Sequence, residues 1–206
     1  VVAGGFGRTG GEELHKKILA SLSKAELKAA GDIIRGPAPN APYEDVRRIL
    51  DGLRQQRPDC IISVGGGSCI DAVKAAAANF ALDGVCNSFE DFFGIGQVSR
   101  ALAESGRKLL PHVASITASG AASHLTKYSN VTDMRIPQKM LIIDDALVPP
   151  AAHFDYSTTL SSPAELTMDG AFDGVSHCLE VYMGLPPALL AKGEPFCLTG
   201  IELLIN

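Results

Sequence analysis

Short apolar runs alternate with amphipathic stretches along the first third of the chain, and glycines or prolines separate them. Leu14, Ile18 and Leu22 recur at i, i+4 and i+8, which predicts a helix with one apolar face. The predicted elements are a strand at 1–3, a helix around 14–22, a strand at 33–34, a helix over 46–53 and a strand over 59–64. Such strand and helix alternation predicts a parallel sheet with crossover helices.

The alternation of apolar and amphipathic stretches weakens after residue 82, and no helix or strand is predicted over residues 82–105. Apolar strands return at 112–116 and 139–143. Pro149-Pro150 and the Ser/Thr cluster at 157–163 mark a boundary, beyond which the pattern is helical. We expect one helix to begin at Pro163 and a second to run from Phe196 to Ile205. The domains predicted from this boundary are 1–156 and 157–206.

Composition narrows the class of protein. The chain has 206 residues, is 46% hydrophobic and carries a net charge of −5, with acids and bases interspersed. This charge distribution argues against a nucleic-acid partner, and no apolar run approaches the ~20 residues of a membrane span. Five cysteines without a C-x-x-C pair indicate reduced thiols and a cytoplasmic protein.

Three glycines, Gly65, Gly66 and Gly67, stand between the strand over 59–64 and the next helix. Residues without Cβ let backbone N–H groups approach a ligand, and a helix start attracts anions. We therefore expect a phosphate site here, with Ser68 capping the helix and donating to the same phosphate. The spacing is neither Walker A nor G-x-G-x-x-G, and a tight turn without a ligand is the alternative.

Two further small-residue turns, at 4–11 and 117–123, also follow predicted strands. The turns that follow parallel strands lie together at the carboxyl edge of the sheet, where this architecture binds ligands. Three such turns favour a nucleotide site at that edge.

Asp173 and His177 are four residues apart on a predicted helix. This spacing puts a carboxylate and an imidazole on one face, where both can reach a single cation. A surface ion pair or a histidine satisfied in the core is the alternative for such a pair.

The string Gly-Gly-Gly-Ser-x-x-Asp-x-x-Lys at 65–74 and the string Asp-x-x-x-His-x-x-Glu at 173–180 resemble signatures of the iron-containing (group III) alcohol dehydrogenases. The block at 117–122, the segment 131–133 with Lys139, and Asn40 resemble further family segments in the same order. The resemblance implies an α/β fold: a parallel-sheet dinucleotide-binding domain at 1–156, then the start of an all-helical metal and substrate domain at 157–206. It also implies a metal-dependent, NAD(P)-linked alcohol dehydrogenase or aldehyde reductase.

The resemblance also assigns residues. The implied cofactor-binding residues are Gly5, Asn40, Gly65, Gly66, Gly67, Ser68, Asp71, Thr117, Ala118, Gly120, Ala121 and Lys139. Asp173 and His177 are implied to be ligands of Fe²⁺ or Zn²⁺ and to act in catalysis through that metal. The two further histidine ligands of the family have no counterpart in this sequence, and His124 stands where the family usually has Glu.

The turn after the first strand bears on cofactor choice. The NAD-preferring members of the family carry an acid there, whereas this chain has Gly4-Gly5-Phe6-Gly7-Arg8, in which Arg8 can pair with a 2′-phosphate. We therefore expect NADP(H) over NAD(H).

The expected partners are a small alcohol or aldehyde substrate and, as in many family members, a second copy in a homodimer. We expect the 206 residues to be an incomplete portion of a longer enzyme. Two alternatives stay open: an enzyme like dehydroquinate synthase or glycerol-1-phosphate dehydrogenase, and a non-catalytic nucleotide-binding module.

Overall fold

A computed structural model describes residues 1–4, 11–86, 88–160 and 162–206. The chain forms two compact units, one of residues 1–116 and 122–154, the other of residues 117–121 and 155–206. The functional roles that the sequence assigns to domains 1–156 and 157–206 stay predictions.

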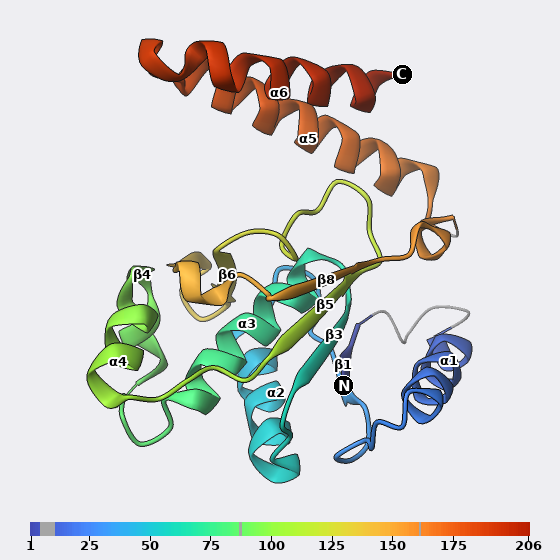
Figure 1. Ribbon diagram of the computed structural model, residues 1–206, viewed down its shortest axis with the longest axis vertical. Coiled ribbons are helices and arrows are strands. Elements are labelled where there is room, and N and C mark those ends of the chain that lie inside the picture. The colour runs from blue at the N-terminus through green and yellow to red at the C-terminus, as the bar shows by residue number, and fades with distance from the viewer. Residues whose placement is uncertain (5–10, 87, 161) are drawn as a thin grey trace. The chain divides into compact units, whose positions relative to one another are not determined.

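The first unit is built on a five-stranded sheet with strand order β2-β1-β3-β5-β8 (Figure 1). All neighbouring strands in it run parallel. The strands are β1 (Val2–Ala3), β2 (Ile34–Arg35), β3 (Ile61–Gly65), β5 (His112–Ile116) and β8 (Ala151–Phe154). This sheet confirms the α/β fold that the strand and helix alternation predicted.

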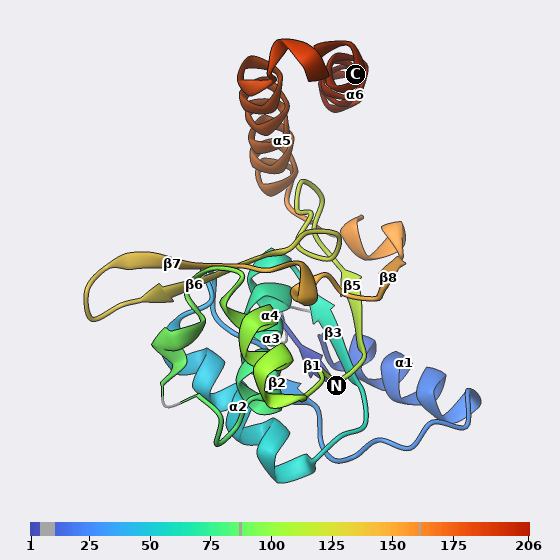
Figure 2. The ribbon, with the colours of Figure 1, turned by 60° about the vertical axis from the view of Figure 1, so that its left-hand side comes forward.

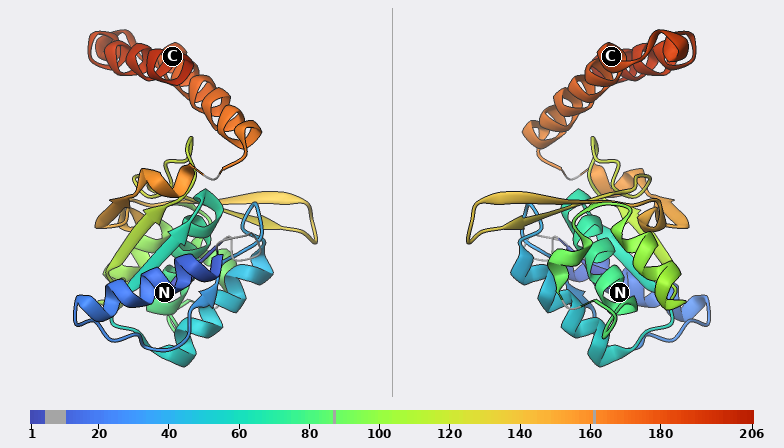
Figure 3. Two further views of the ribbon diagram at one scale, coloured as in Figure 1. Left: turned by 90° about the vertical axis from the view of Figure 1, so that its right-hand side faces the viewer. Right: turned by 90° about the vertical axis from the view of Figure 1, so that its left-hand side faces the viewer.

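Helices cover both faces of this sheet, with α1 (Gly11–Lys24) on one face and α2 (Tyr43–Gln56) and α3 (Gly67–Ala81) on the other (Figure 3). The side chains at 46, 49, 50 and 53 are buried, as the apolar stripe of α2 predicted. Helix α3 is buried almost throughout because alanines at 75–78 let neighbouring elements approach it closely.

A smaller sheet has the order β4-β7-β6 and contains β4 (Gly94–Ile95), β6 (Tyr128–Asp133) and β7 (Gln138–Ile143). Strands β6 and β7 form an antiparallel hairpin that extends as an arm in Figure 2. The inward positions of β6 are Ser129, Val131 and Asp133, so two of three buried side chains are polar. The hydrophobic pattern of the sequence therefore gave no strand here.

The sequence pattern also missed several elements outside the hairpin. The region 82–105, which predicted none, contains the 3₁₀ helix η1 (Phe89–Phe92), β4 and α4 (Gln97–Ser105). Strand β8 was missed because it is a four-residue edge strand directly after Pro149-Pro150, and most of its side chains are exposed.

The second unit contains α5 (Ala164–Gly184) and α6 (Pro187–Ile205), which pack on each other. The predicted start of the last helix at Phe196 is wrong, because Pro187 occupies the first turn and Pro195 lies inside the helix. Among the described residues of α5 and α6, only Cys197 is buried. In the part of the chain that the structure describes, no helix combines the length and the hydrophobicity of a membrane span.

Candidate functional site

The glycine turn joins β3 to α3 at the carboxyl edge of the sheet. Gly66 is the N-cap of α3, and no side chain of the described residues caps this helix, which leaves its start as a candidate anion site. The prediction that Ser68 caps this helix is wrong, since Ser68 already lies within it. A Cβ at Gly65 would come 2.6 Å from the Cβ of Cys69, so the turn needs glycine there.

Ser68 instead binds the turn that contains Asn40. Its hydroxyl accepts the backbone N–H of Asn40 at 3.0 Å, and the hydroxyl of Thr132 donates to the Asn40 carbonyl at 2.7 Å. Asn40 and Ala41 both have positive φ values, 67° and 47°. The structure therefore brings together two predicted site residues, Asn40 and Ser68, that are 28 positions apart.

Lys139 lies opposite Thr132 in the hairpin, where the strand register pairs the two residues. Directly paired residues of neighbouring strands share a face, so Lys139 lies on the face that presents Thr132 to Asn40. Ser68, Asn40, Thr132 and Lys139 together form what we call the nucleotide cluster. Thr132 was not among the predicted cofactor-binding residues, and the only signal for it in the sequence was the resemblance of segment 131–133 to the family.

Asp71 and Lys74 fix the hairpin to α3. The Asp71 carboxylate accepts the N–H of Asn130 at 3.0 Å, while the Lys74 ammonium donates to the carbonyls of Thr126 and Tyr128 at 2.6 and 2.9 Å. Burial raises the pKa of Asp71 and lowers the pKa of Lys74 to about 8. These hydrogen bonds of Asp71 and Lys74 thus orient β6 on α3. The predicted cofactor contact of Asp71 stays a prediction.

The first small-residue turn begins at Gly4, whose N–H donates to the carbonyl of Val64 at 2.8 Å. A Cβ on Gly36, after β2, would come 2.7 Å from the Gly4 Cα, so the two backbones are in direct contact. Gly5 and Arg8, which carry the predicted cofactor contact and the NADP(H) preference, lie outside the described residues.

The third small-residue turn lies largely in the second unit, which includes Thr117, Ala118, Gly120 and Ala121. Gly120 has φ 77°, and a Cβ there would come 2.5 Å from the backbone of Gly170 on α5. Close approach to α5 therefore requires glycine at 120. The cofactor contacts that the sequence assigns to this turn stay predictions.

Asp173 and His177 lie one turn apart on α5, with Oδ2 and Nε2 separated by 3.6 Å. Glu180 approaches the other ring nitrogen at 3.7 Å, and all three side chains are exposed. A carboxylate and an imidazole are donors that Fe²⁺ and Zn²⁺ both accept, so the pair fits a divalent metal in its chemistry. Across the described ranges, no group of three or more such side chains is arranged to hold a metal ion.

Two further histidines are buried in the first unit. The His112 imidazole bonds the Ser63 hydroxyl at 2.7 Å, and burial, aided by the Lys74 charge, lowers the pKa of His112 to about 4. His124 packs edge-to-face on Phe154 at 4.9 Å, and neither of its ring nitrogens has a hydrogen-bond partner among the described residues. Hydrophobic patterning did not identify either group as buried.

Comparison with known proteins identifies the family. The iron-containing alcohol dehydrogenase family matches residues 2–156. Alcohol dehydrogenase 4 of Saccharomyces cerevisiae is 31% identical over 191 residues, which cover 93% of this chain and 46% of that protein. The NAD-dependent methanol dehydrogenase of Bacillus methanolicus is 29% identical over 170 residues, covering 82% and 42% of the two chains.

The structure also resembles those of solved alcohol dehydrogenases. The solved alcohol dehydrogenase from Oenococcus oeni superposes with a TM-score of 0.82 at 22% identity, covering 99% of this chain and 49% of that one. The chain thus spans about half the length of the relatives it matches. From the match over residues 2–156 we conclude that the chain belongs to the iron-containing alcohol dehydrogenase family.

Proposed function

We propose that this chain is part of a metal-dependent, NADP(H)-linked alcohol dehydrogenase or aldehyde reductase. Family membership supports this proposal, and two relatives are named for the oxidation of alcohols. The observation that carries it is the nucleotide cluster, which joins Ser68 of the glycine turn to Asn40, Thr132 and Lys139.

Each residue of the cluster has a distinct task in this proposal. The N–H groups at the start of α3 and the Ser68 hydroxyl bind the pyrophosphate, and the Lys139 ammonium balances its charge. Asn40, held between Ser68 and Thr132, binds the adenosine side. Asp173 and His177 hold the divalent metal. When bound, the nicotinamide supplies hydride transfer and the metal supplies Lewis acidity for the interconversion of alcohol and carbonyl.

Three finer points belong to the same proposal. NADP(H) is preferred because residues 4–8, directly after β1, contain no acid and Arg8 can pair with the 2′-phosphate, although the Bacillus methanolicus relative is named NAD-dependent. The five cysteines are free, which suits the cytoplasm. The enzyme works as a homodimer on small alcohols and aldehydes.

Calorimetric titration of the full chain with NADP⁺ and NAD⁺ tests the nucleotide site. We expect NADP⁺ to bind at least fivefold more tightly than NAD⁺, and Lys139→Met to weaken NADP⁺ binding about tenfold, since one phosphate partner is lost. Lys108→Met, which removes an exposed charge outside the cluster, is the matched control and is expected to stay within about twofold. Undetectable binding, or equal affinity in Lys139→Met, would refute the site.

A second experiment separates catalysis from binding. The chain is loaded with Fe²⁺ or Zn²⁺, its metal content is measured, and NADPH oxidation is followed with short aldehydes. Asp173→Asn is expected to lower both metal content and turnover while NADP⁺ affinity is kept. Because only two metal donors converge among the described residues, the competing function is a nucleotide-binding module. NADP⁺ binding without metal or turnover would establish that module instead.

A further inference from the structure

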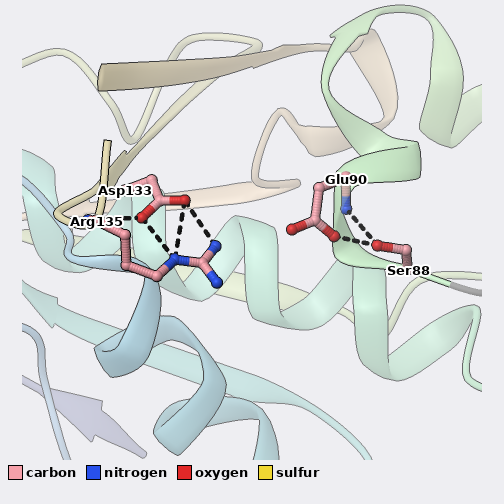
Figure 4. Close-up of polar contacts among 4 residues, drawn as sticks. All are labelled: Ser88, Glu90, Asp133 and Arg135. Carbon is pink, nitrogen blue, oxygen red and sulfur yellow. Dashed lines mark hydrogen bonds and ion pairs between the residues drawn. The ribbon is translucent and has the colours of Figure 1, made fainter. Parts of the chain in front are cut away.

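The turn of the β6–β7 hairpin carries an ion pair that the proposed function leaves unused (Figure 4). Arg135 donates from Nε and Nη2 to the Asp133 carboxylate at 2.9 and 2.7 Å, and its backbone N–H donates to the same carboxylate at 2.9 Å. The Asp133 side chain is only 6% exposed. These bonds from Arg135 lower the pKa of Asp133 to about 2, so the pair is charged at neutral pH.

The same guanidinium lies over the ring of Tyr43, the first residue of α2. Its central carbon is 5.2 Å from the ring centroid, which is within the range of a cation–π contact. Tyr43 is buried and packs edge-to-face on Phe89 at 5.1 Å. Hydrogen bonds from Ser88 and from its own backbone N–H lower the pKa of Glu90, and the Arg135 charge and a hydrogen bond from Tyr43 contribute less. Arg135 therefore connects the hairpin to α2 and, through Tyr43, to η1.

This connection flanks the nucleotide cluster. Thr132, next to Asp133, donates its hydroxyl to the carbonyl of Asn40 and its N–H to the carbonyl of Ala41, at 2.7 and 3.1 Å. Asn40 and Tyr43 are three residues apart, as are Thr132 and Arg135. The two short segments are thus joined at both ends, by Thr132 on Asn40 and by Arg135 on Tyr43.

The Asn40 turn needs such support. Asn40 and Ala41 both have left-handed backbone conformations, which asparagine tolerates but which are strained for alanine. Conformations of this kind persist when surrounding contacts fix them. Ser68 and Thr132 supply those contacts at Asn40, and the position of Thr132 depends on the end of β6.

We propose that Arg135 is a positioning residue of the nucleotide site: paired with Asp133 and placed over Tyr43, it holds the hairpin on α2, and thereby Thr132 on Asn40 with Lys139 alongside. The proposal rests on the proposed function. Arg135 itself makes no contact with the nucleotide and acts through the hairpin.

Calorimetric titration with NADP⁺ tests this role in the full chain. Arg135→Met is expected to weaken NADP⁺ binding about tenfold, and Arg135→Lys, which keeps a cation for Asp133, to recover part of the loss. Arg107→Gln removes one exposed charge outside the hairpin and is expected to stay within about twofold of the unaltered chain. Arg135→Met and Thr132→Val should be non-additive, because both release the same contact with Asn40.

The pH dependence tests whether the pairing of Arg135 with Asp133 contributes to the positioning. Without Arg135, the buried Asp133 carboxylate lacks its partner and its pKa rises, so acid relieves the unpaired charge. The affinity ratio of Arg135→Met to the unaltered chain is therefore expected to move part of the way toward one between pH 7.5 and 5, because acid does not restore the contact with Tyr43. In Asp133→Asn/Arg135→Met, the ratio is expected to stay constant with pH.

The possible failures are distinguishable. If the unaltered chain does not bind NADP⁺, the proposed function fails. Amide hydrogen exchange then decides whether Arg135 holds the hairpin on α2. Faster exchange at Asn40 and Ala41 in Arg135→Met supports it, and unchanged exchange overturns it. If the unaltered chain binds NADP⁺ and Arg135→Met matches it within about twofold, the positioning role is overturned. Should Arg135→Met fail to fold by circular dichroism, Arg135→Gln, which also removes the cation but keeps a polar side chain at this exposed position, is judged by the same criteria.

Discussion

Arg57 at the end of α2 shows how one backbone angle sets a local free energy. It caps the helix in the left-handed conformation, with φ 45°, and its N–H donates to the Leu53 carbonyl at 2.8 Å. Glycine adopts this conformation without the Cβ penalty. We expect Arg57→Gly to raise the free energy of unfolding by about 1 kcal/mol, measured by urea denaturation.

Gly106 provides the reverse control. It caps α4 at φ 68°, and a Cβ there would have nothing within 4 Å, so space is not at issue. Gly106→Ala is expected to lower the free energy of unfolding by about 1 kcal/mol. If both variants had the same free energy of unfolding as the unaltered chain, the left-handed cap would carry no cost in this protein.

Single residues also mark what the sequence could predict of the site. Asn40 and Ser68 were predicted to bind cofactor because they stand in motifs with a recognisable order. Arg135 had no such signal and Thr132 only the resemblance of segment 131–133 to the family, since a threonine and an arginine near a hairpin turn carry no pattern of their own. Their roles arise from contacts across about 90 residues of chain, between Thr132 and Asn40 and between Arg135 and Tyr43.

The junction of β3 and α3 is an element in which packing, rather than a ligand, already demands glycine. A Cβ at Gly65 would come 2.6 Å from the Cβ of Cys69 and 3.0 Å from its sulfur. We expect Gly65→Ala to displace the glycine turn and to lower the free energy of unfolding by about 1–3 kcal/mol, measured by urea denaturation. NADP⁺ affinity should fall in parallel, because the same turn presents the N–H groups of α3.

Two controls isolate this clash. Gly184→Ala adds a methyl group at the end of α5, where nothing lies within 4 Å, and is expected to be neutral or slightly stabilising. Cys69→Ala removes the sulfur but keeps the Cβ, so it should not rescue Gly65→Ala. A fully stable Gly65→Ala chain would contradict the close contact.

Elements whose apolar residues recur at regular spacing could be predicted from the sequence. Elements that bury polar side chains could not. Helix α2 buries the side chains at 46, 49, 50 and 53, and its stripe is visible in the sequence. Strand β6 buries Ser129 and Asp133 by bonding them to Asp71 and Arg135, so its inward face reads as polar. Only the partners, which lie elsewhere in the chain, explain that burial.

At the scale of the whole molecule, His112 links folding to pH. Its pKa lies at about 4 in the folded protein, below the ordinary value of 6.5, because burial and the Lys74 charge oppose protonation. Between these values the unfolded chain binds more protons, so stability is present above about pH 6.5 and is lost as the pH falls toward 4. We expect this group alone to remove about 3 kcal/mol, measured by urea unfolding at pH 7 and pH 4.

The matched variant for this effect is Ser63→Ala/His112→Leu, which replaces both partners of the buried hydrogen bond with apolar groups. Its acid loss should be smaller than that of the unaltered chain by about 3 kcal/mol. His153→Gln, at an exposed histidine, should leave the acid loss unchanged. An identical acid loss in the double variant would show that His112 does not control it.

The order of strands, turns and motifs sufficed to predict the parallel-sheet fold and the family. It did not predict how the site assembles, because the glycine turn, the Asn40 turn and the hairpin meet only through tertiary hydrogen bonds.

The burial of Lys74 has a practical consequence. Its side chain is 1% exposed and held by two carbonyls, whereas Lys139 is exposed on the hairpin. An amine-acylating reagent should therefore modify Lys139 at once and reach Lys74 only when the chain opens globally. A single mass-spectrometric time course would report ligand occupancy at one lysine and the rate of unfolding at the other.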